Sequence, residues 1–163
     1  MKVKPQRKFH DEYYHANRWR ELGMVAGGTG IAPMLQMIRA ILANPEERTK
    51  MTLVYANRFE TDIMMKDELD STAAKHPDRF KVHYVLSKPP ATGWSGGTGW
   101  VGDADLSPAH MPAPGPGVMV LVCGRDEFLV TVSGMTTRGP SPSPGKKGPS
   151  EIPLSNRESA REH

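Results

Sequence analysis

The chain has 163 residues, of which 37% are hydrophobic, and it carries a formal net charge of +3. This length predicts one ordinary domain with a core of its own. The basic residues concentrate towards the two ends and only 7% of the residues are aromatic, a pattern that argues against nucleic-acid binding. We also expect no membrane span, because the longest apolar run is far too short to cross a bilayer.

The cysteine and histidine content restricts the chemistry. Cys123 is the one cysteine, which excludes an internal disulfide framework and a multi-cysteine zinc module and suits a reducing compartment. We therefore expect a cytoplasmic protein. The six histidines show no metal-ligand spacing, and the carboxylates fall at helix caps and exposed faces, so we predict neither a metal site nor a catalytic pair of acids.

The first predicted unit is a strand, a turn and a helix. Residues 1–20 are polar and without a clear period, and we interpret them as a leading segment. The apolar stretch 22–26 predicts a strand, and GGTG at 27–30 predicts a turn. A helix should follow with Pro33 as its first residue, because that position needs no N–H donor.

This first helix has an apolar face and a clear end. Leu35, Ile38 and Leu42 recur at helical spacing and predict the face that packs on the sheet. Asn44–Pro45 then predicts the end of the helix, since proline cannot continue it.

A second and a third strand follow, with a helix between them. Residues 51–56 read as a buried strand, and Thr61 or Asp62 is a candidate cap for the next helix. That helix is predicted to end at His76–Pro77, and its apolar positions recur every four residues, at Met65, Leu69 and Ala73. Residues 80–87 alternate as a third strand does.

The last regular elements are an apolar strand and a short helix. Residues 117–124 are continuously apolar, which is typical of a strand covered by helices on both faces, and RDEFLVTVSGM predicts a helix after it. Strands that alternate with helices predict an α/β fold with a doubly wound parallel sheet, which we assign to residues 21–134. Residues 135–163 are rich in proline, glycine and serine, and we expect a disordered tail and a sheet that is incomplete at its C-terminal edge.

The motif GGTGIAP resembles two phosphate-binding loops without satisfying either. A P-loop requires lysine where this chain has Ile31, and the dinucleotide fingerprint requires glycine where it has Pro33. The motif alone therefore leaves open a plain strand-to-helix turn. A second break, Cys123–Gly124, follows an apolar strand on the sheet edge where ligands of open α/β sheets bind, although a lone buried cysteine is more often a packing residue.

Four segments together carry a family resemblance. They are GMVAGGTGIAPMLQMIRAIL, the stretch from LVYANR to VLSKPP, GWSGGTGWV and VLVCG, in this order and at matching spacing over about residues 18–128. These segments resemble the pyridine-nucleotide-binding half of the NADH–cytochrome b5 reductase group, within the ferredoxin–NADP reductase-like flavoenzymes. The resemblance implies hydride transfer from NADH to FAD, followed by single-electron transfer to a haem protein. It leaves NADPH open as an alternative donor.

The resemblance also implies a set of cofactor-binding residues. The glycine-rich turn would let the cofactors approach the backbone, Thr29 would offer a hydroxyl near the nicotinamide, and Cys123–Gly124 would lie beside that ring. Asn57 and Arg58 would contact ribose or phosphate. The full set is Gly27, Gly28, Thr29, Gly30, Pro33, Asn57, Arg58, Ser95, Cys123 and Gly124, with no catalytic side chain among them.

Three departures from the family are visible. The family's flavin domain would precede residue 1, Ala32 stands where many relatives have threonine, and CGRDEF replaces the proline-rich continuation and the last helix and strand that the family leads us to expect. In addition, Ser95 stands near the position of an acidic residue found in many NADH-using relatives, which leaves the choice between NADH and NADPH open. The simplest account is a partial copy in which residues 1–20 are the remnant of a link to a flavin domain. Such a chain would act with a cytochrome b5-like acceptor, with a flavin domain on another chain, and at an intracellular membrane only through partners. The alternatives are a non-catalytic NAD(H)-binding module and a nonfunctional truncated product.

Overall fold

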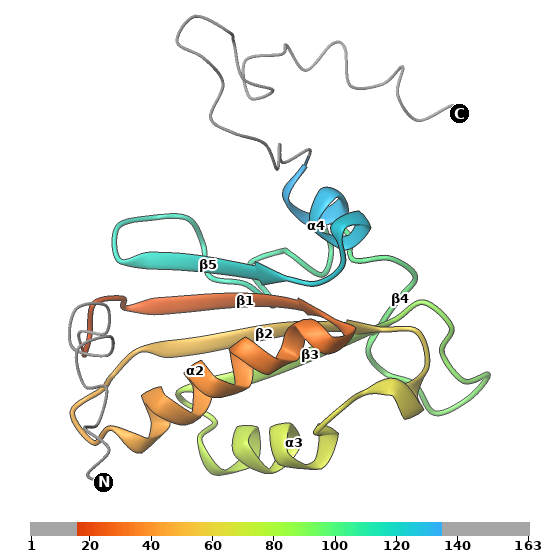
Figure 1. Ribbon diagram of the computed structural model, residues 1–163. Coiled ribbons are helices and arrows are strands. Elements are labelled where there is room, and N and C mark those ends of the chain that lie inside the picture. Colours follow the sequence, from red (N-terminus) through yellow and green to blue (C-terminus); the bar gives the residue numbers. More distant parts are fainter. Residues whose placement is uncertain (1–15, 135–163) are drawn as a thin grey trace, which may run out of the picture.

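A five-stranded parallel sheet organises the part of the chain that the computed structural model describes, residues 16–134. Its strands are β1 (Glu21–Gly27), β2 (Lys50–Asn57), β3 (Phe80–Leu86), β4 (Gly97–Thr98) and β5 (Val118–Cys123). They lie side by side in the order β4-β3-β2-β1-β5, and every pair is parallel (Figure 1). The predicted parallel α/β sheet is therefore confirmed, whereas the expected disordered tail lies outside the described residues.

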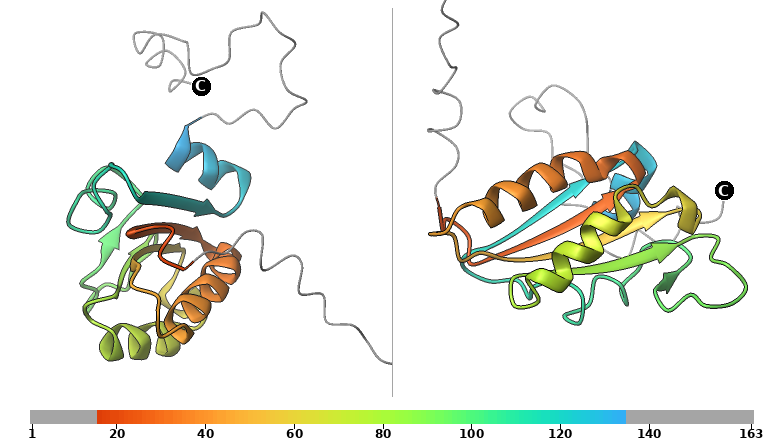
Figure 2. Two further views of the ribbon diagram at one scale, coloured as in Figure 1. Left: turned by 90° about the vertical axis from the view of Figure 1, so that its left-hand side faces the viewer. Right: turned by 90° about the horizontal axis from the view of Figure 1, so that it is seen from below.

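Helices lie on both faces of this sheet. The helices α2 (Ile31–Ala43) and α3 (Lys66–Lys75) cover one face, and α4 (Asp126–Ser133) lies beside β5 on the other side (Figures 1 and 2). Two short 3-10 turns, Gly28–Gly30 and Glu60–Asp62, follow β1 and β2. No helix in the described part of the chain is both long and apolar enough to cross a bilayer.

The two faces of the sheet bury separate sets of side chains because residues alternate along each strand. Leu53 and Tyr55 point to the α2–α3 face and belong to the larger cluster of buried residues. Val25, Val54 and Val85 point to the opposite face, where they pack against the segment 101–111 and α4. Because of this second, smaller cluster, both faces of the sheet bury hydrophobic side chains.

The helix α2 begins two residues earlier than the sequence predicts. Its first residue is Ile31 and its N-cap is Gly30, so Pro33 is the third helical residue and not the first. Proline is tolerated there because the first four N–H groups of a helix have no intrahelical acceptor. Leu35 and Ile38 are buried as the apolar face predicts, whereas Leu42 is only partly covered and Ile41, which the prediction did not include, is buried.

The start of α3 also differs from the prediction, because neither Thr61 nor Asp62 caps it. Asp62 instead accepts a hydrogen bond from the Phe59 N–H at 3.1 Å and so closes the 3-10 turn. The helix begins at Lys66, after Met65, whose φ of 59° is left-handed and whose side chain is 46% exposed. The predicted end of the helix at His76–Pro77 is confirmed.

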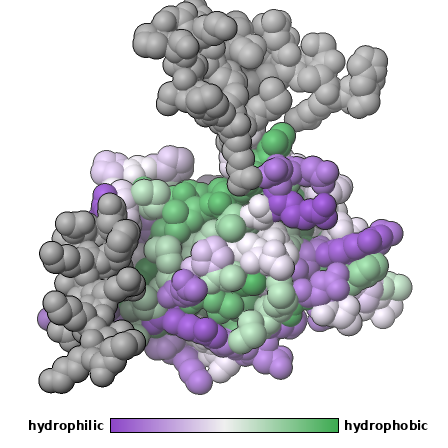
Figure 3. All heavy atoms as spheres, viewed as in Figure 1, coloured by the Kyte–Doolittle hydropathy of each residue, from purple (hydrophilic) through white to green (hydrophobic). Residues whose placement is uncertain are grey.

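The strand β5 is less covered than its apolar sequence predicts. It lies at the outside of the sheet among the described residues, pairs with β1, and has no fully buried residue. Val120 is 46% exposed. The prediction of a strand covered on both faces is therefore wrong, and an apolar surface remains beside α2 in the view of Figure 3.

Candidate functional site

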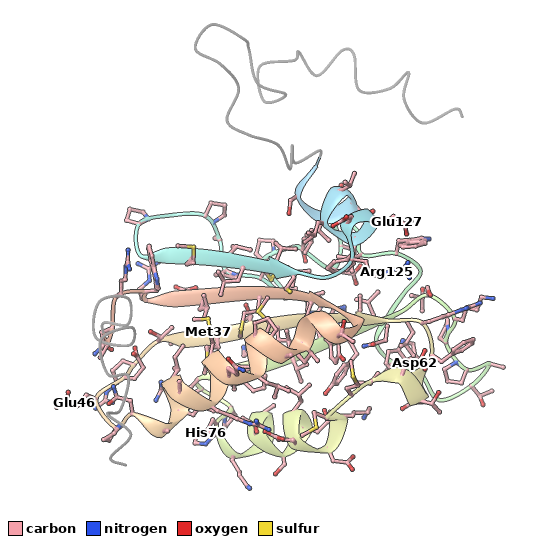
Figure 4. All side chains as sticks on the ribbon, viewed as in Figure 1. Met37, Glu46, Asp62, His76, Arg125 and Glu127 are labelled. Carbon is pink, nitrogen blue, oxygen red and sulfur yellow. The ribbon has the colours of Figure 1, made fainter. Side chains whose placement is uncertain are left out.

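The residues predicted to bind the cofactor lie along one edge of the sheet. Strand register places Ala26 opposite Cys123, Gly27 opposite Ala56, and Asn57 opposite Leu86. The carboxyl ends of β5, β1, β2 and β3 are therefore level. In the side-chain view, Asp62, Arg125 and Glu127 lie towards this end and Glu46 lies at the opposite end (Figure 4).

The glycine-rich turn is open around its two middle residues, Gly28 and Thr29. Gly28 has a left-handed φ of 53°, and a side chain placed there would meet nothing within 4 Å. Thr29 is exposed and comes just before Gly30, the N-cap of α2, so its hydroxyl does not occupy the capping position. An open backbone at a helix N-terminus is the environment that anionic groups prefer.

Gly30 has a different role, which is a close approach between two backbone segments. A β-carbon on Gly30 would overlap the carbonyl group of Cys123 and would lie 2.9 Å from the backbone nitrogen of Gly124. A residue larger than glycine would therefore push apart the turn after β1 and the end of β5. This contact joins the two sequence motifs that the fold brings together.

Gly27 and Gly124 make room for one aromatic ring. A β-carbon on either residue would come within 3 Å of the ring of Phe128, which is on α4. Phe128 is partly buried and packs with Val122 and Val132 against the smaller core cluster. The implied role of Gly124, leaving space for a nicotinamide ring, stays a prediction, and the structure supplies a second reason for glycine at both positions.

Cys123 and Pro33 lie close to the turn but differ in exposure. Cys123 is partly buried and packs against the larger core cluster, which favours the packing role that a lone cysteine usually has. Pro33 and Ala32 are exposed in the first turn of α2. Their side chains thus border the surface in front of the turn.

The second strand brings two polar residues to the same edge. The Nδ2 atom of Asn57 is buried and makes no hydrogen bond within the described part of the chain. The exposed guanidinium of Arg58 lies 5.2 Å from the centre of the Phe59 ring. The Asn57 side chain interacts with the Tyr55 hydroxyl, but its buried Nδ2 still lacks a well-formed hydrogen bond. Because such an atom is costly to bury, Asn57 is a stronger candidate for a ligand contact than its exposed neighbour.

Ser95 lies at the far end of this edge. It is exposed in the loop that precedes β4, and the Trp94 indole nitrogen donates to the carbonyl oxygen of Gly97 at 2.9 Å to fix that loop. Because β4 and β5 are the outer strands, Ser95 and Cys123 are separated by about 19 Å at the usual strand spacing. The candidate residues therefore form a long row, which suits an extended ligand better than a single phosphate.

The segment that follows β4 is held against β3 by a histidine and a carboxylate. His83 on β3 and Asp105 lie 2.9 Å apart, and Asp105 also accepts a hydrogen bond from the Gly102 N–H at 3.1 Å. The His83 ring stacks on His110 with a centroid distance of 3.7 Å. Burial lowers the pKa of His110, and the neighbouring His83 lowers it further. This arrangement was not predicted, because the sequence does not bring residues 83, 105 and 110 together.

Two further residues at the site were missed by sequence reasoning. The fully buried Tyr55 donates its hydroxyl to the carbonyl oxygen of Gly28 at 3.1 Å, and Phe128 packs under Gly27 and Gly124. Burial raises the pKa of Tyr55, so its hydroxyl remains a donor at physiological pH. For Tyr55, the one feature of the sequence that could have indicated a role was a hydroxyl group in an otherwise apolar strand. For Phe128, the sequence contained no such feature.

Shallow pockets occur at the other end of the sheet. Two of about 410 and 430 Å³ share Thr52, Pro77, Phe80 and His110 in their lining, and neither contains a predicted site residue. In the described residues no group of three or more histidine, cysteine, aspartate or glutamate side chains is arranged to hold a metal ion.

Comparisons with known proteins identify the family of this domain. Residues 24–133 match the family model described as the oxidoreductase NAD-binding domain. The chain is 49% identical over 123 residues to NADH-cytochrome b5 reductase 1 of Mortierella alpina, covering 76% of this chain and 40% of that protein. It is 46% identical over 112 residues to human NADH-cytochrome b5 reductase 2, covering 69% of this chain and 40% of that protein.

Solved structures give the same result. The cytochrome b5 reductase domain of Ulva prolifera nitrate reductase is 39% identical, with a TM-score of 0.65 over 68% of this chain and 42% of that chain. The CS-b5R domains of human Ncb5or, in an NAD+ form, are 27% identical, with a TM-score of 0.61 over 80% of this chain and 35% of that one. The predicted resemblance is confirmed for the NAD-binding part, and the chain spans about two-fifths of the length of the curated relatives described above.

Proposed function

Since the chain belongs to the oxidoreductase NAD-binding domain family, we propose that it is the nucleotide-binding half of an NADH-dependent reductase of the cytochrome b5 reductase type. The observation that carries the proposal is the row of open backbone and polar groups along the carboxyl edge of the sheet. In this proposal the nicotinamide half of NADH lies between the turn that follows β1 and the end of β5. The adenosine half lies towards Asn57, Arg58 and Ser95.

The residues of the turn fit a dinucleotide. Gly28 presents backbone with no side chain around it, and Thr29 offers an exposed hydroxyl and amide at the N-terminus of α2. The unsatisfied Nδ2 of Asn57 would donate to an oxygen of the ribose or phosphate. Each contact supplies binding and orientation, which is what a hydride-transfer protein contributes to cofactor chemistry.

NADH, when bound, supplies the hydride, and FAD is the proposed acceptor. We propose that the flavin is held by a separate domain, in the same polypeptide or on another chain, that faces the β1–β5 end of this edge. Cys123 is proposed to border the nicotinamide as a small, apolar side chain and not as a nucleophile, because hydride transfer forms no covalent intermediate with the protein. The contact of Gly30 with Cys123 keeps the two walls of this position at a fixed separation.

A haem protein such as cytochrome b5 is the proposed final electron acceptor, in line with the names of the relatives. The same proposal places the protein in the cytoplasm, at an intracellular membrane only through its partners. Subcellular fractionation with and without a salt wash would test the location, since a peripheral protein is released by salt.

The activity is tested by reconstitution. The full chain is mixed with FAD and with the separately expressed flavin domain of a relative, and ferricyanide or cytochrome b5 reduction by NADH is measured. Reduction that needs both proteins supports the proposal. NADH binding without turnover would favour the non-catalytic NAD(H)-binding module, and no binding would contradict both.

A variant pair sharpens this test. Asn57→Leu removes the proposed polar contact while it keeps the branched shape of the side chain, and it should raise KM for NADH about tenfold, as expected for a lost hydrogen bond to a polar ligand. Asn44→Leu, at the far end of α2, changes the same chemical groups away from the edge and should leave KM unchanged. Equal effects of the two substitutions would contradict the proposed position of the nucleotide.

A further inference from the structure

The hydroxyl of Tyr55 is hydrogen-bonded to one peptide group of the glycine-rich turn. Tyr55 lies on β2 with no exposed surface, and its hydroxyl donates to the carbonyl oxygen of Gly28 at 3.1 Å. The same carbonyl accepts the N–H of Ile31 within the 3-10 turn. Two donors therefore hold the Gly28 carbonyl from the protein side.

Holding this carbonyl fixes the amide on the other side of the peptide. The N–H of Thr29 belongs to the same trans, planar peptide group as the Gly28 carbonyl, and the two point in opposite directions. With the carbonyl turned towards Tyr55 and Ile31, the Thr29 N–H points away from α2 towards the open side of the turn. Gly28 itself has no neighbour within 4 Å of its missing side chain, so no packing contact of its own would keep it in the left-handed conformation.

We propose that Tyr55 is a positioning residue for dinucleotide binding, which presets the Thr29 amide as a donor to the nicotinamide half of the ligand. This inference rests on the proposed function, because it concerns how that site is organised. Tyr55 touches no ligand in this account and acts on the turn through the Gly28–Thr29 peptide, while its hydroxyl also interacts with the side chain of Asn57.

The surroundings of Tyr55 suit this role. Its ring centre lies 6.3 Å from that of Tyr84, whose own hydroxyl donates to Asp70 at 2.7 Å. Lys66 completes the group by an ion pair with Asp70 at 2.8 Å. Tyr55 thus packs beside a ring that is itself hydrogen-bonded, and burial raises the pKa of the Tyr55 hydroxyl, which stays protonated.

The chain offers a matched control for the test. Tyr55→Phe removes the hydroxyl that reaches the turn, whereas Tyr84→Phe removes the hydroxyl of the partly buried ring beside it without touching the turn. Both substitutions keep the aromatic volume. The measurements are NAD+ and 5′-AMP affinity by calorimetry and the backbone amide spectrum of the 15N-labelled full chain without ligand.

The expected result separates the two halves of the ligand. Tyr55→Phe should shift the Thr29 amide resonance and weaken NAD+ binding about fivefold to tenfold, the usual effect of one lost hydrogen bond. The affinity for 5′-AMP should fall much less than that for NAD+, because the Tyr55 hydroxyl reaches the adenosine half only through its interaction with Asn57. Tyr84→Phe should leave the Thr29 resonance and both affinities as they are.

Two results would overturn the inference: unchanged NAD+ affinity in Tyr55→Phe, or an equal loss of NAD+ and 5′-AMP affinity, which would indicate a general structural role. Failure of the proposed function looks different, because the unsubstituted chain would then bind no NAD+. In that case the ligand-free Thr29 resonance decides whether Tyr55 sets the turn, since it must shift in Tyr55→Phe and not in Tyr84→Phe.

Discussion

Gly30 and Cys123 meet backbone to backbone, and the α-carbon of Gly30 leaves no room for a side chain against the Cys123 carbonyl. The two residues are far apart in sequence, and their contact brings the turn after β1 to the end of β5. The candidate site depends on this contact, because the proposed nicotinamide position lies between the two segments.

Substitution of Gly30 should therefore be costly although its backbone is ordinary. Gly30 has a φ of −60°, which any residue adopts, so the whole cost of Gly30→Ala comes from the overlap with Cys123. We expect a loss of about 1–3 kcal/mol in the free energy of unfolding, the usual cost of overpacking. Gly28→Asn, at a left-handed position with open space, should cost less than about 1 kcal/mol because asparagine tolerates this conformation. Urea unfolding compares the two, and equal losses would contradict the assigned roles.

The fit of Phe128 against Gly124 predicts that substitutions at the two sites are not additive. Gly124→Ala should destabilise the chain because the new methyl group meets the Phe128 ring. In a Phe128→Ala background the methyl group has space, so the loss should nearly disappear. A double-mutant cycle by thermal or urea unfolding should give a coupling energy of about 1 kcal/mol or more. Additivity within about 0.5 kcal/mol would show that the ring does not determine the size of residue 124.

The histidine stack predicts a pH dependence of stability. Burial and the neighbouring His83 lower the pKa of His110 below its usual 6.5, so the unfolded chain takes up a proton at this residue before the folded chain does. Stability from His110 is then fully present above pH 6.5 and is lost as the pH falls through 6.5 towards the lower folded value. Melting temperatures between pH 8 and 5 should show this loss, and His110→Phe should reduce it. An unchanged pH profile in that variant would contradict the assignment.

Ser95 offers a test of the choice between NADH and NADPH. Ser95→Asp places a carboxylate in the exposed loop before β4, where it should repel the additional 2′-phosphate of NADPH. We expect the ratio of NADPH to NADH dissociation constants to rise roughly fivefold at low salt, and less at high salt. Ser71→Asp, which adds the same charge at an exposed position on α3, should leave the ratio unchanged. A rise in both variants would indicate a general charge effect and not a local one.

The strands could be predicted well from the sequence, because their continuous apolar runs are buried in the hydrophobic core. β1, β2, β3 and β5 occur where such runs occur, and Leu69 and Ile38 pack as helical spacing predicts. The helix starts are predicted less well, because 3-10 turns after β1 and β2 take up the residues that local rules assign to caps. The two-residue strand β4 has too short a pattern to be seen.

In the candidate site, too, some features could be predicted from the sequence and others could not. GGTG and Cys123–Gly124 were placed on one sheet edge from the topology that the strands imply, and their register bears this out. The reasons for the individual glycines were not accessible, since Gly30 depends on a backbone contact and Gly27 and Gly124 depend on a ring from α4. Tyr55 looked like an ordinary core residue because its hydroxyl bond reaches a residue far away in sequence.

The central claim is that this chain binds a pyridine dinucleotide along the carboxyl edge of its sheet, and an NMR titration of the 15N-labelled full chain with NAD+ tests it most directly. We predict saturable shifts of the backbone amides of Thr29, Asn57 and Gly124, with no comparable change at Lys50 and Phe80 beside the pockets at the other end. Shifts confined to those pockets, or no saturable shift at millimolar NAD+, would contradict the claim.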